Sequence, residues 1–206
     1  MIRRAVLCGG LSLALLGRGA APAKAQANDA ERATAFIRKS GEELGAIVQA
    51  RVTESERRQR LRAFLDRVVD VDGLAHFCLG RFWAQASEAQ RATYTSLYHG
   101  VLLNAVLARV GDYGGPEMRT IYGHVGPRED VMLVPTTLQW PTKPPANLTW
   151  ALRMDGPAPR IVDLIVEGTS LRVTVRSDYA AFLNSHGNSI DVLIEAMRSQ
   201  ATPPGG

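Results

Sequence analysis

The chain has 206 residues, 46% of them hydrophobic and 21% charged, and these proportions exclude a collagen-like, coiled-coil or largely disordered protein. The length fits one domain of ordinary size and is too short for a multidomain enzyme. The net charge of +4 would favour a nucleic-acid or membrane-surface binder if the chain stayed whole.

The first 25 residues have the pattern of a secretory signal peptide. Arg3 and Arg4 precede an uncharged apolar run over residues 5–16, and residues 23–25 form a small-x-small cleavage site. The apolar run is shorter than the roughly 20 residues that cross a bilayer. We therefore expect cleavage before Gln26, export by the general secretory route, and no membrane or lipid anchor.

Removal of this signal peptide changes the charge and the cysteine content. Four of the 24 basic residues and none of the 20 acidic ones lie in it, so the mature chain has 20 of each and no net charge. Nucleic-acid binding, which depends on phosphate neutralisation, then loses its main support. Cys78 remains as the single cysteine, which excludes an intramolecular disulfide and predicts a small buried apolar side chain.

A helical half is predicted to follow the signal peptide. Apolar residues recur at helical spacing over residues 29–50, 53–68, 71–79 and 87–110, the last being the longest of these helices. Thr53 with Glu56 and Ser87 with Gln90 have the spacing of capping boxes, which satisfy unpaired amides at helix starts. Gly80 suits the left-handed turn that ends the third helix.

The helix over residues 87–110 has apolar side chains on two nearly opposite faces. One face carries Tyr94, Leu97, Tyr98, Val101, Ala105 and Ala108, and the other carries Leu103, Val106, Leu107 and Val110. Because both faces are apolar, we expect this helix to lie between other helices and a sheet.

Strands are predicted in the second half of the chain. They cover residues 118–125, 131–140, 148–154 and 160–166. The turns between them, including Gly126-Pro127-Arg128, are short, which favours an antiparallel meander over parallel crossovers. Pro135 indicates a bulge or an edge position in the second strand.

The chain is predicted to become helical again after these strands. One helix is expected from Ser170, although Val173 and Val175 would equally prolong the last strand, and another over residues 189–198. Residues 201–206 are expected to form a disordered tail. Residues 26–200 thus make one α+β domain, mainly helical to residue 113, whose helices pack on one face of a small, strongly curved, antiparallel four-stranded sheet.

The sequence has no recognisable catalytic or metal-binding motif. It lacks a Gly-x-Ser-x-Gly elbow, a phosphate loop and a Gly-x-Gly-x-x-Gly turn, and its four histidines lie on separate predicted elements. No cofactor, metal or enzymatic activity is therefore predicted. Asp163 and Glu167, beside an apolar strand end, could supply a general base, but a structural role is the favoured interpretation, with Asp163 accepting hydrogen bonds from backbone amides and Glu167 at a turn.

Two groups of motifs, taken together, resemble one known family. The first comprises Val71-Asp72, Leu79-Gly80-Arg81-Phe82-Trp83 and Ser87-Glu88-Ala89-Gln90, with Tyr94, Tyr98, Leu102-Leu103 and Tyr113 downstream. The second comprises Asp163-Leu164-Ile165-Val166-Glu167-Gly168-Thr169-Ser170-Leu171, followed by Arg176, Phe182 and Gly187. In this order, over residues 36–198, they resemble the periplasmic phospholipid-binding MlaC family, also called the toluene-tolerance family. Pro159, in place of a usual tryptophan, and the lack of a usual tyrosine within residues 104–107 depart from its pattern.

The resemblance implies a soluble, monomeric periplasmic carrier that maintains outer-membrane lipid asymmetry. Its fold would be an NTF2/cystatin-like cone that encloses an apolar cavity for a phospholipid. Its transient partners would be an ATP-driven inner-membrane ABC complex and an outer-membrane lipoprotein complex. Two alternatives stay open: a carrier of another apolar lipid such as a hopanoid, and a small NTF2-like cavity enzyme that uses Asp163 or Glu167.

The residues expected to line the cavity come from three segments. They are Phe82 and Trp83 near the rim, Leu97, Val101, Leu102 and Ala105 on the long helix, and Trp150, Leu152, Leu164 and Val166 on the sheet. Hydrophobic periodicity alone is compatible with a filled core as well as a hollow one. The expectation of a hollow core thus follows from the resemblance.

Overall fold

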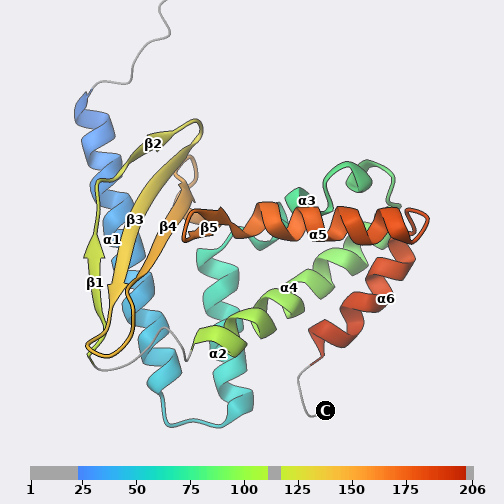
Figure 1. The fold of residues 1–206 in the computed structure, drawn as a ribbon, viewed down its shortest axis with the longest axis horizontal. Coiled ribbons are helices and arrows are strands. Elements are labelled where there is room, and N and C mark those ends of the chain that lie inside the picture. The colour runs from blue at the N-terminus through green and yellow to red at the C-terminus, as the bar shows by residue number, and fades with distance from the viewer. Residues whose placement is uncertain (1–22, 111–116, 203–206) are drawn as a thin grey trace, which may run out of the picture.

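The structure is a computed structural model that describes residues 23–110 and 117–202 (Figure 1). Positions 1–22 of the predicted signal peptide and positions 203–206 of the predicted tail lie outside the described residues. Ala201, the first residue of that tail, is helical, and the Thr202 N–H after it bonds to the Arg198 carbonyl. The prediction of disorder is therefore wrong at residue 201.

The order of elements is helical, then mainly strands, then helical, as predicted. The described helices are α1 (Ala23–Gln49), α2 (Glu54–Val68), α3 (Val71–Leu79), the short 3-10 helix η1 (Gly80–Ala84), α4 (Glu88–Val110), α5 (Leu171–Ser185) and α6 (Ile190–Ala201). The described strands are β1 (Arg119–Tyr122), β2 (Gly126–Arg128), β3 (Val131–Gln139), β4 (Ala146–Arg153), β5 (Arg160–Val166) and β6 (Thr169–Ser170).

Helix α1 begins earlier than predicted and, with 27 residues against 23, is longer than α4. Four of its first eight residues are alanine, the residue with the highest helix propensity. This composition allows the helix to start before residue 29. The prediction that the helix over residues 87–110 is the longest is therefore wrong.

The caps of the other helices follow from local sequence. At the start of α4, Gln90 N–H donates to Ser87 Oγ at 3.2 Å and Ser87 N–H donates to Gln90 Oε1 at 3.0 Å, which is a complete capping box. At the start of α2, Thr53 Oγ1 accepts the Glu56 N–H at 3.2 Å, while the Glu56 carboxylate pairs with Arg60. Ser170 caps α5, which settles the ambiguous segment as helix.

The sheet has six strands in place of the predicted four. Its order is β1-β3-β4-β5-β6, with β2 also paired to β3, and all neighbouring strands are antiparallel. Gly126–Arg128, predicted as a turn, forms β2, and Thr169–Ser170 forms β6 after the turn at Glu167 and Gly168. Both additional strands are too short to show a period-2 pattern in the sequence.

Pro135 lies within the interior strand β3 and not at an edge or a bulge. Strand β1 ends opposite Thr136 and β2 reaches only to the position opposite Leu133, so Pro135 faces the interruption between them. Its missing N–H therefore leaves no ladder bond unmade on that side. Its carbonyl accepts the Gly123 N–H at 2.9 Å. The register shift in the sheet falls instead between β4 and β5.

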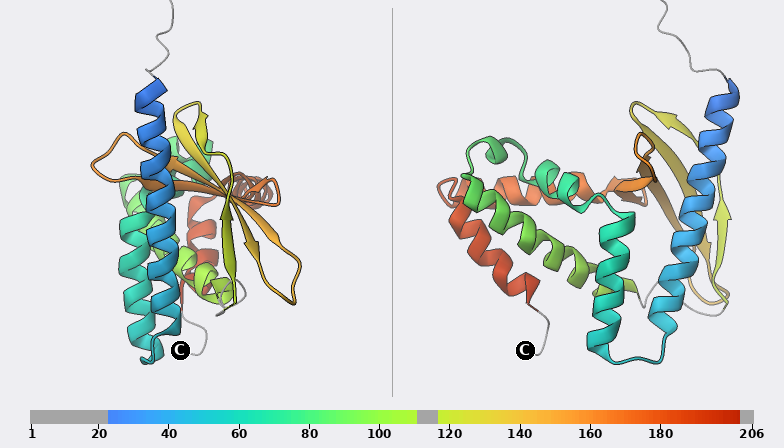
Figure 2. Two further views of the ribbon diagram at one scale, coloured as in Figure 1. Left: turned by 90° about the vertical axis from the view of Figure 1, so that its left-hand side faces the viewer. Right: turned by 180° about the vertical axis from the view of Figure 1, so that it is seen from behind.

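The sheet and most of the helices form two ends of the molecule, joined by α2 (Figures 1 and 2). Helix α1 lies along one face of the sheet against β3 and β2, whereas α3, α4, α5 and α6 gather beyond the β5 edge. The prediction that the helices share one face of the sheet thus holds for α1 only.

Helix α4 packs against α6, α3 and α2, and not between helices and a sheet as predicted. The amphipathic α6 supplies the apolar surface that was expected from the sheet. Its buried side chains are Ile190, Leu193, Ile194 and Met197. Asn104 also fastens α4 to its neighbours: its amide nitrogen donates to the carbonyls of Gln200, at 2.6 Å, and Thr202, at 3.1 Å, and its Oδ1 accepts from Arg58 of α2 at 2.7 Å.

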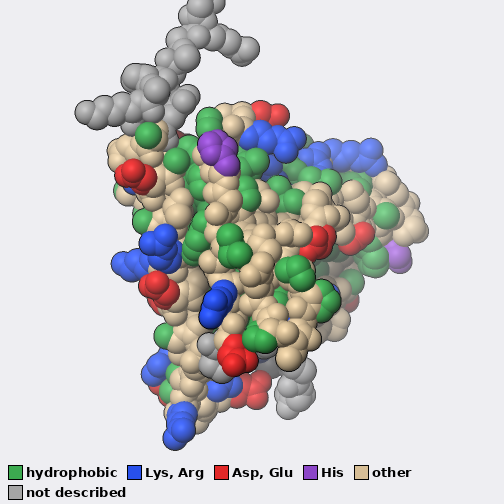
Figure 3. All heavy atoms as spheres, turned by 60° about the vertical axis from the view of Figure 1, so that its left-hand side comes forward, with side chains coloured by type: hydrophobic (Ala, Val, Ile, Leu, Met, Phe, Trp, Pro, Cys, Tyr) green, Lys and Arg blue, Asp and Glu red, His purple; other side chains and the backbone are tan. Residues whose placement is uncertain are grey.

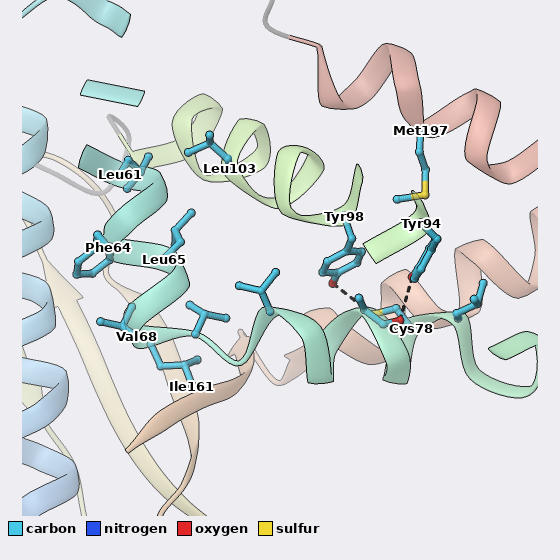
Figure 4. Close-up of a cluster of buried hydrophobic side chains, with 14 of the residues drawn as sticks. Leu61, Phe64, Leu65, Val68, Cys78, Tyr94, Tyr98, Leu103, Ile161 and Met197 are labelled. Carbon is cyan, nitrogen blue, oxygen red and sulfur yellow. Dashed lines mark hydrogen bonds between the residues drawn. The ribbon is translucent and has the colours of Figure 1, made fainter. Parts of the chain in front are cut away.

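The hydrophobic core runs through α2 from one end of the molecule to the other (Figure 4). Phe64 points from α2 toward the sheet end, and Leu65 points toward α4. Where α2 ends, Val69 forms a parallel bridge with Ile161 of β5, and the Asp70 N–H donates to the Ile161 carbonyl at 2.9 Å. The two ends therefore share one continuous core.

Candidate functional site

The four predicted cavity residues of the sheet lie on one face. Trp150 pairs with Leu164 across β4 and β5, Val166 lies two residues beyond Leu164, and Leu152 lies two residues beyond Trp150. Leu152 is fully buried, whereas the other three are half-buried. Trp150 Nε1–H donates to Thr136 Oγ1 at 3.0 Å on the same face, which orients the indole ring.

The four predicted cavity residues of α4 differ in exposure. Leu97, Val101 and Leu102 are half-buried and pack against the core, while Ala105 is exposed. The fully buried positions of this helix are instead Tyr94, Tyr98 and Leu103. Since α2 stands between α4 and the sheet, the structure does not bring the two sets of predicted residues into one described cavity (Figure 1).

Phe82 and Trp83, the predicted rim residues, belong to η1 at the junction of α3 and α4. Phe82 is 1% exposed. The Trp83 ring lies 4.6 Å from the His76 ring and 6.5 Å from the Tyr94 ring, and the Arg91 guanidinium lies 5.5 Å from its centroid. These contacts hold both aromatic side chains within the helical end of the molecule.

Two open hollows lie on the surface of the described residues. The larger, of about 560 Å³, is formed by α2 and α4 and includes Trp83 and His99. The smaller, of about 430 Å³, lies between α3, α5 and the sheet. Neither is lined by the predicted residues of the sheet or of α4, so the described structure does not show the expected apolar cavity.

Several apolar side chains remain open to solvent. Among the large ones, Ile121 of β1 is 50% exposed, Val173 and Leu171 at the start of α5 are 49% and 43% exposed, and Val192 of α6 is 39% exposed. Figure 3 shows hydrophobic side chains spread over the sheet end of the molecule between charged ones. Apolar surface is thus available beyond the core at both ends of the molecule.

Asp163 is buried where β5 approaches α5. Its Oδ2 accepts the Ser170 hydroxyl at 2.6 Å, and its Oδ1 accepts the Arg172 backbone N–H at 3.2 Å. The Arg172 side-chain Nε lies 3.5 Å from Oδ2. The predicted role of Asp163 as an acceptor for a backbone amide is confirmed, and both of its oxygens are occupied by the start of α5.

Glu167 lies in the turn between β5 and β6, with a positive φ of 46°. Its Oε1 accepts the Asn147 backbone N–H at 2.6 Å, and its Oε2 accepts the Asn147 side-chain amide at 3.2 Å. These hydrogen bonds, the backbone one first, lower the pKa of the Glu167 carboxyl. A carboxylate held in its charged form in this way is a poor candidate for a general acid or base at neutral pH.

Cys78 belongs to a buried group of polar-tipped side chains (Figure 4). Its Sγ lies 3.4 Å from Tyr98 Oη, and the Tyr94 hydroxyl donates to the Ala75 carbonyl at 3.0 Å. Burial raises the pKa of the Cys78 thiol and of both tyrosines. The thiol is therefore the small buried side chain that was predicted, and the tyrosine hydroxyls stay protonated.

Sequence reasoning named Arg176 only as part of a family-like motif and missed the group of arginines that it forms in the smaller hollow. Arg153 comes from β4, and Arg172 and Arg176 come from α5. The signal that could have found two of them is the i, i+4 spacing of Arg172 and Arg176, which places both on one side of a helix. Among the described residues, no group of His, Cys, Asp and Glu is arranged to hold a metal ion, and no helix is long and apolar enough to cross a membrane.

Comparisons with known proteins identify solved structures with the same fold and the family of the chain. Seven chains of solved structures match, among them a phospholipid-binding protein from Ralstonia solanacearum in complex with a phospholipid, with a TM-score of 0.66 at 15% identity. That match covers 81% of this chain and 95% of the other, and it shows a shared fold. No match was found among curated protein sequences. The family model described as MlaC protein matches residues 39–199, and the chain therefore belongs to the MlaC family.

Proposed function

We propose that this protein is a lipid carrier that binds the acyl chains of a phospholipid. The observation that carries the proposal is the MlaC family match over most of the chain, joined to the fold shared with a protein that was solved in complex with a phospholipid. The half-buried apolar side chains on both sides of α2 supply the surface that such a ligand needs.

The acyl chains would lie along α2, between the sheet and α4. On the sheet side they would contact Trp150, Leu164 and Val166, and on the α4 side Val101 and Leu102. Each methylene group moved from water to an apolar site gains about 0.8 kcal/mol, so two long chains gain enough to separate side chains that touch in the described structure. The remaining predicted lining residues, Phe82, Trp83, Leu97, Ala105 and Leu152, form the wider surroundings of this proposed site.

A carrier of this kind has to release its lipid as well as bind it. Because the apolar contribution to binding is large, release requires a partner that offers another apolar environment. We propose that the mature protein works in the periplasm, taking lipid from an ATP-driven inner-membrane complex and exchanging it with an outer-membrane complex. Asp163 and Glu167 are engaged in the fold, which favours this binding role over the cavity enzyme.

The substitution Val101→Trp tests the carrier proposal. It places an indole ring where an acyl chain is proposed to lie, so we expect folded protein to lose most of its bound lipid. Val192→Trp, at an exposed position of α6, is the matched control and should keep the lipid. The measurement is lipid per folded protein, by mass spectrometry of organic extracts, alongside a melting curve for each variant.

A filled core gives a different result. Inserting a large ring into such a core costs about 1 to 3 kcal/mol, so Val101→Trp would melt earlier while no lipid is lost because none was bound. Wild-type protein that carries no lipid, combined with this behaviour, would contradict the proposal. A hopanoid in the extracts in place of phospholipid would support a carrier and change its ligand.

A further inference from the structure

The hollow between α3, α5 and the sheet combines apolar and charged side chains. The apolar ones are Leu74, Phe77, Val131 and Val162, and the charged ones are Asp70, Asp130, Arg153, Arg172 and Arg176. Its volume of about 430 Å³ lies in the lower part of the range for small-molecule pockets. A hollow of this size and character suits the polar end of an amphipathic molecule.

Two arginines of α5 converge on one aromatic ring of α3. The guanidinium carbons of Arg172 and Arg176 lie 4.5 Å and 4.9 Å from the centroid of Phe77. Gly80 makes room for this arrangement, because a Cβ at that position would lie 3.0 Å from Arg176 Nε. The backbone of Gly80 also has a positive φ of 57°, a second reason why a side chain is disfavoured there.

The carboxylates near the hollow compensate these guanidinium groups only in part. Asp70 forms an ion pair with Arg153, whose Nη1 lies 2.7 Å from Asp70 Oδ2. Asp163 lies 3.5 Å from Arg172 Nε, yet that buried nitrogen has no hydrogen-bond partner among the described residues. Within residues 23–110 and 117–202, no hydrogen bond or ion pair engages the guanidinium of Arg176, whose contact is with the Phe77 ring. The two guanidinium groups on Phe77 thus face one ion-paired carboxylate, that of Asp163, and the positive charge that remains favours an anion beside them.

We propose that Arg172 and Arg176 bind the phosphate group of a phospholipid, in an inference that rests on the proposed carrier function. A guanidinium offers N–H groups in a planar fork that matches phosphate oxygens. The apolar side chains of the hollow then contact the glycerol. Arg153 and Leu152 are neighbours in β4 and point to opposite faces of the sheet, so the acyl chains would have to pass the edge of the sheet beside α2 to reach the face that carries Trp150. The arginine pair thus distinguishes a phospholipid from a neutral lipid with the same acyl chains.

The test compares two lipids that differ only in the head group. Protein is incubated with vesicles that contain equal amounts of phosphatidylglycerol and a diacylglycerol with the same chains, and the bound lipids are extracted and counted. We expect wild-type protein to prefer phosphatidylglycerol and Arg176→Gln to lose that preference about tenfold, with diacylglycerol binding unchanged. Arg198→Gln, an exposed change on α6, is the control and should keep the preference.

Each outcome separates this inference from the carrier proposal. If neither lipid binds to any variant, the carrier proposal fails and this inference fails with it. If both lipids bind but wild type and Arg176→Gln show the same preference, only the arginine site is overturned. Inorganic phosphate, titrated into lipid-free protein by calorimetry, should bind with a dissociation constant above about 1 mM. Tighter binding that bound lipid does not displace would assign the pair to a free anion and overturn the lipid assignment.

Discussion

At the scale of single residues, Asp163 determines how the start of α5 is held against the sheet. The side chain is 5% exposed and accepts one hydroxyl and one backbone N–H, so its environment is arranged for an acceptor at both oxygens. A carboxylate meets this demand, whereas an amide presents an N–H₂ group at one of the two positions.

We therefore expect Asp163→Asn to lower the free energy of unfolding by about 1 to 3 kcal/mol, the usual effect of leaving buried polar groups unpaired. The measurement is chemical denaturation of the mature protein. Asp178→Asn, at an exposed position of α5, is the matched control and should change stability by less than about 0.5 kcal/mol. Unchanged stability in Asp163→Asn, with loss of an enzymatic activity that wild-type protein has, would favour the cavity enzyme instead.

At the scale of elements, the close contact between α4 and α6 depends on a glycine. A Cβ on Gly100 would lie 3.0 Å from the Cβ of Ala201 and 3.3 Å from its carbonyl oxygen. Gly45, inside α1, has no atom within 4 Å of the same position. The two glycines are both in helix interiors, where glycine is unfavourable, but only one of them has a packing reason to be there.

Replacing each glycine with alanine should separate helix propensity from packing. Gly45→Ala is expected to stabilise the protein by about 0.5 to 1 kcal/mol, which corresponds to a rise in Tm of about 1 to 4 °C. Gly100→Ala should lose this gain or lower Tm, because the end of α6 has to move away from α4. Equal increases in Tm for both variants would show that α6 can move away from α4 without loss of stability, and would contradict this prediction.

At the scale of the whole molecule, the charge of the working protein depends on where it begins. The full chain has a net charge of +4, and removal of residues 1–25 brings it to zero. We expect periplasmic material to start at Gln26 and to remain in the soluble fraction after a salt wash. Intact mass spectrometry and fractionation measure both properties. A mass that retains Met1, or recovery only with membranes, would contradict this prediction.

Local signals in the sequence were sufficient for most helices and for the main strands. The capping box at Ser87 and the turn at Gly80 depend on neighbouring residues only, and both are found as predicted. Long-range packing was less accessible. An apolar face on α4 does not reveal whether α6 or the sheet covers it, since both have apolar side chains to offer. The pairing of β2 depends on a partner strand and not on its own three residues.

The same distinction applies to the candidate site. Strand alternation in the sequence is enough to place Leu164 and Val166 on one face of β5, whereas the position of Trp150 on the same face depends on the register of β4 and β5. The separation of these residues from α4 by α2 is a property of the tertiary arrangement. The convergence of Arg172 and Arg176 on Phe77 likewise joins segments almost a hundred residues apart, which no local pattern encodes.

The hydrogen bonds of Asn104 also determine when α4 can complete its packing during synthesis. Its amide partners lie 96 and 98 positions further along the chain, and ribosomes add about 5 to 20 residues per second, so α4 waits about 5 to 20 s for them during synthesis. Until then, the face of α4 that α6 covers remains open. The helical end of a nascent chain therefore cannot complete its packing early, and an incompletely folded chain is the form that a narrow export channel, as expected from the predicted signal peptide, can accept.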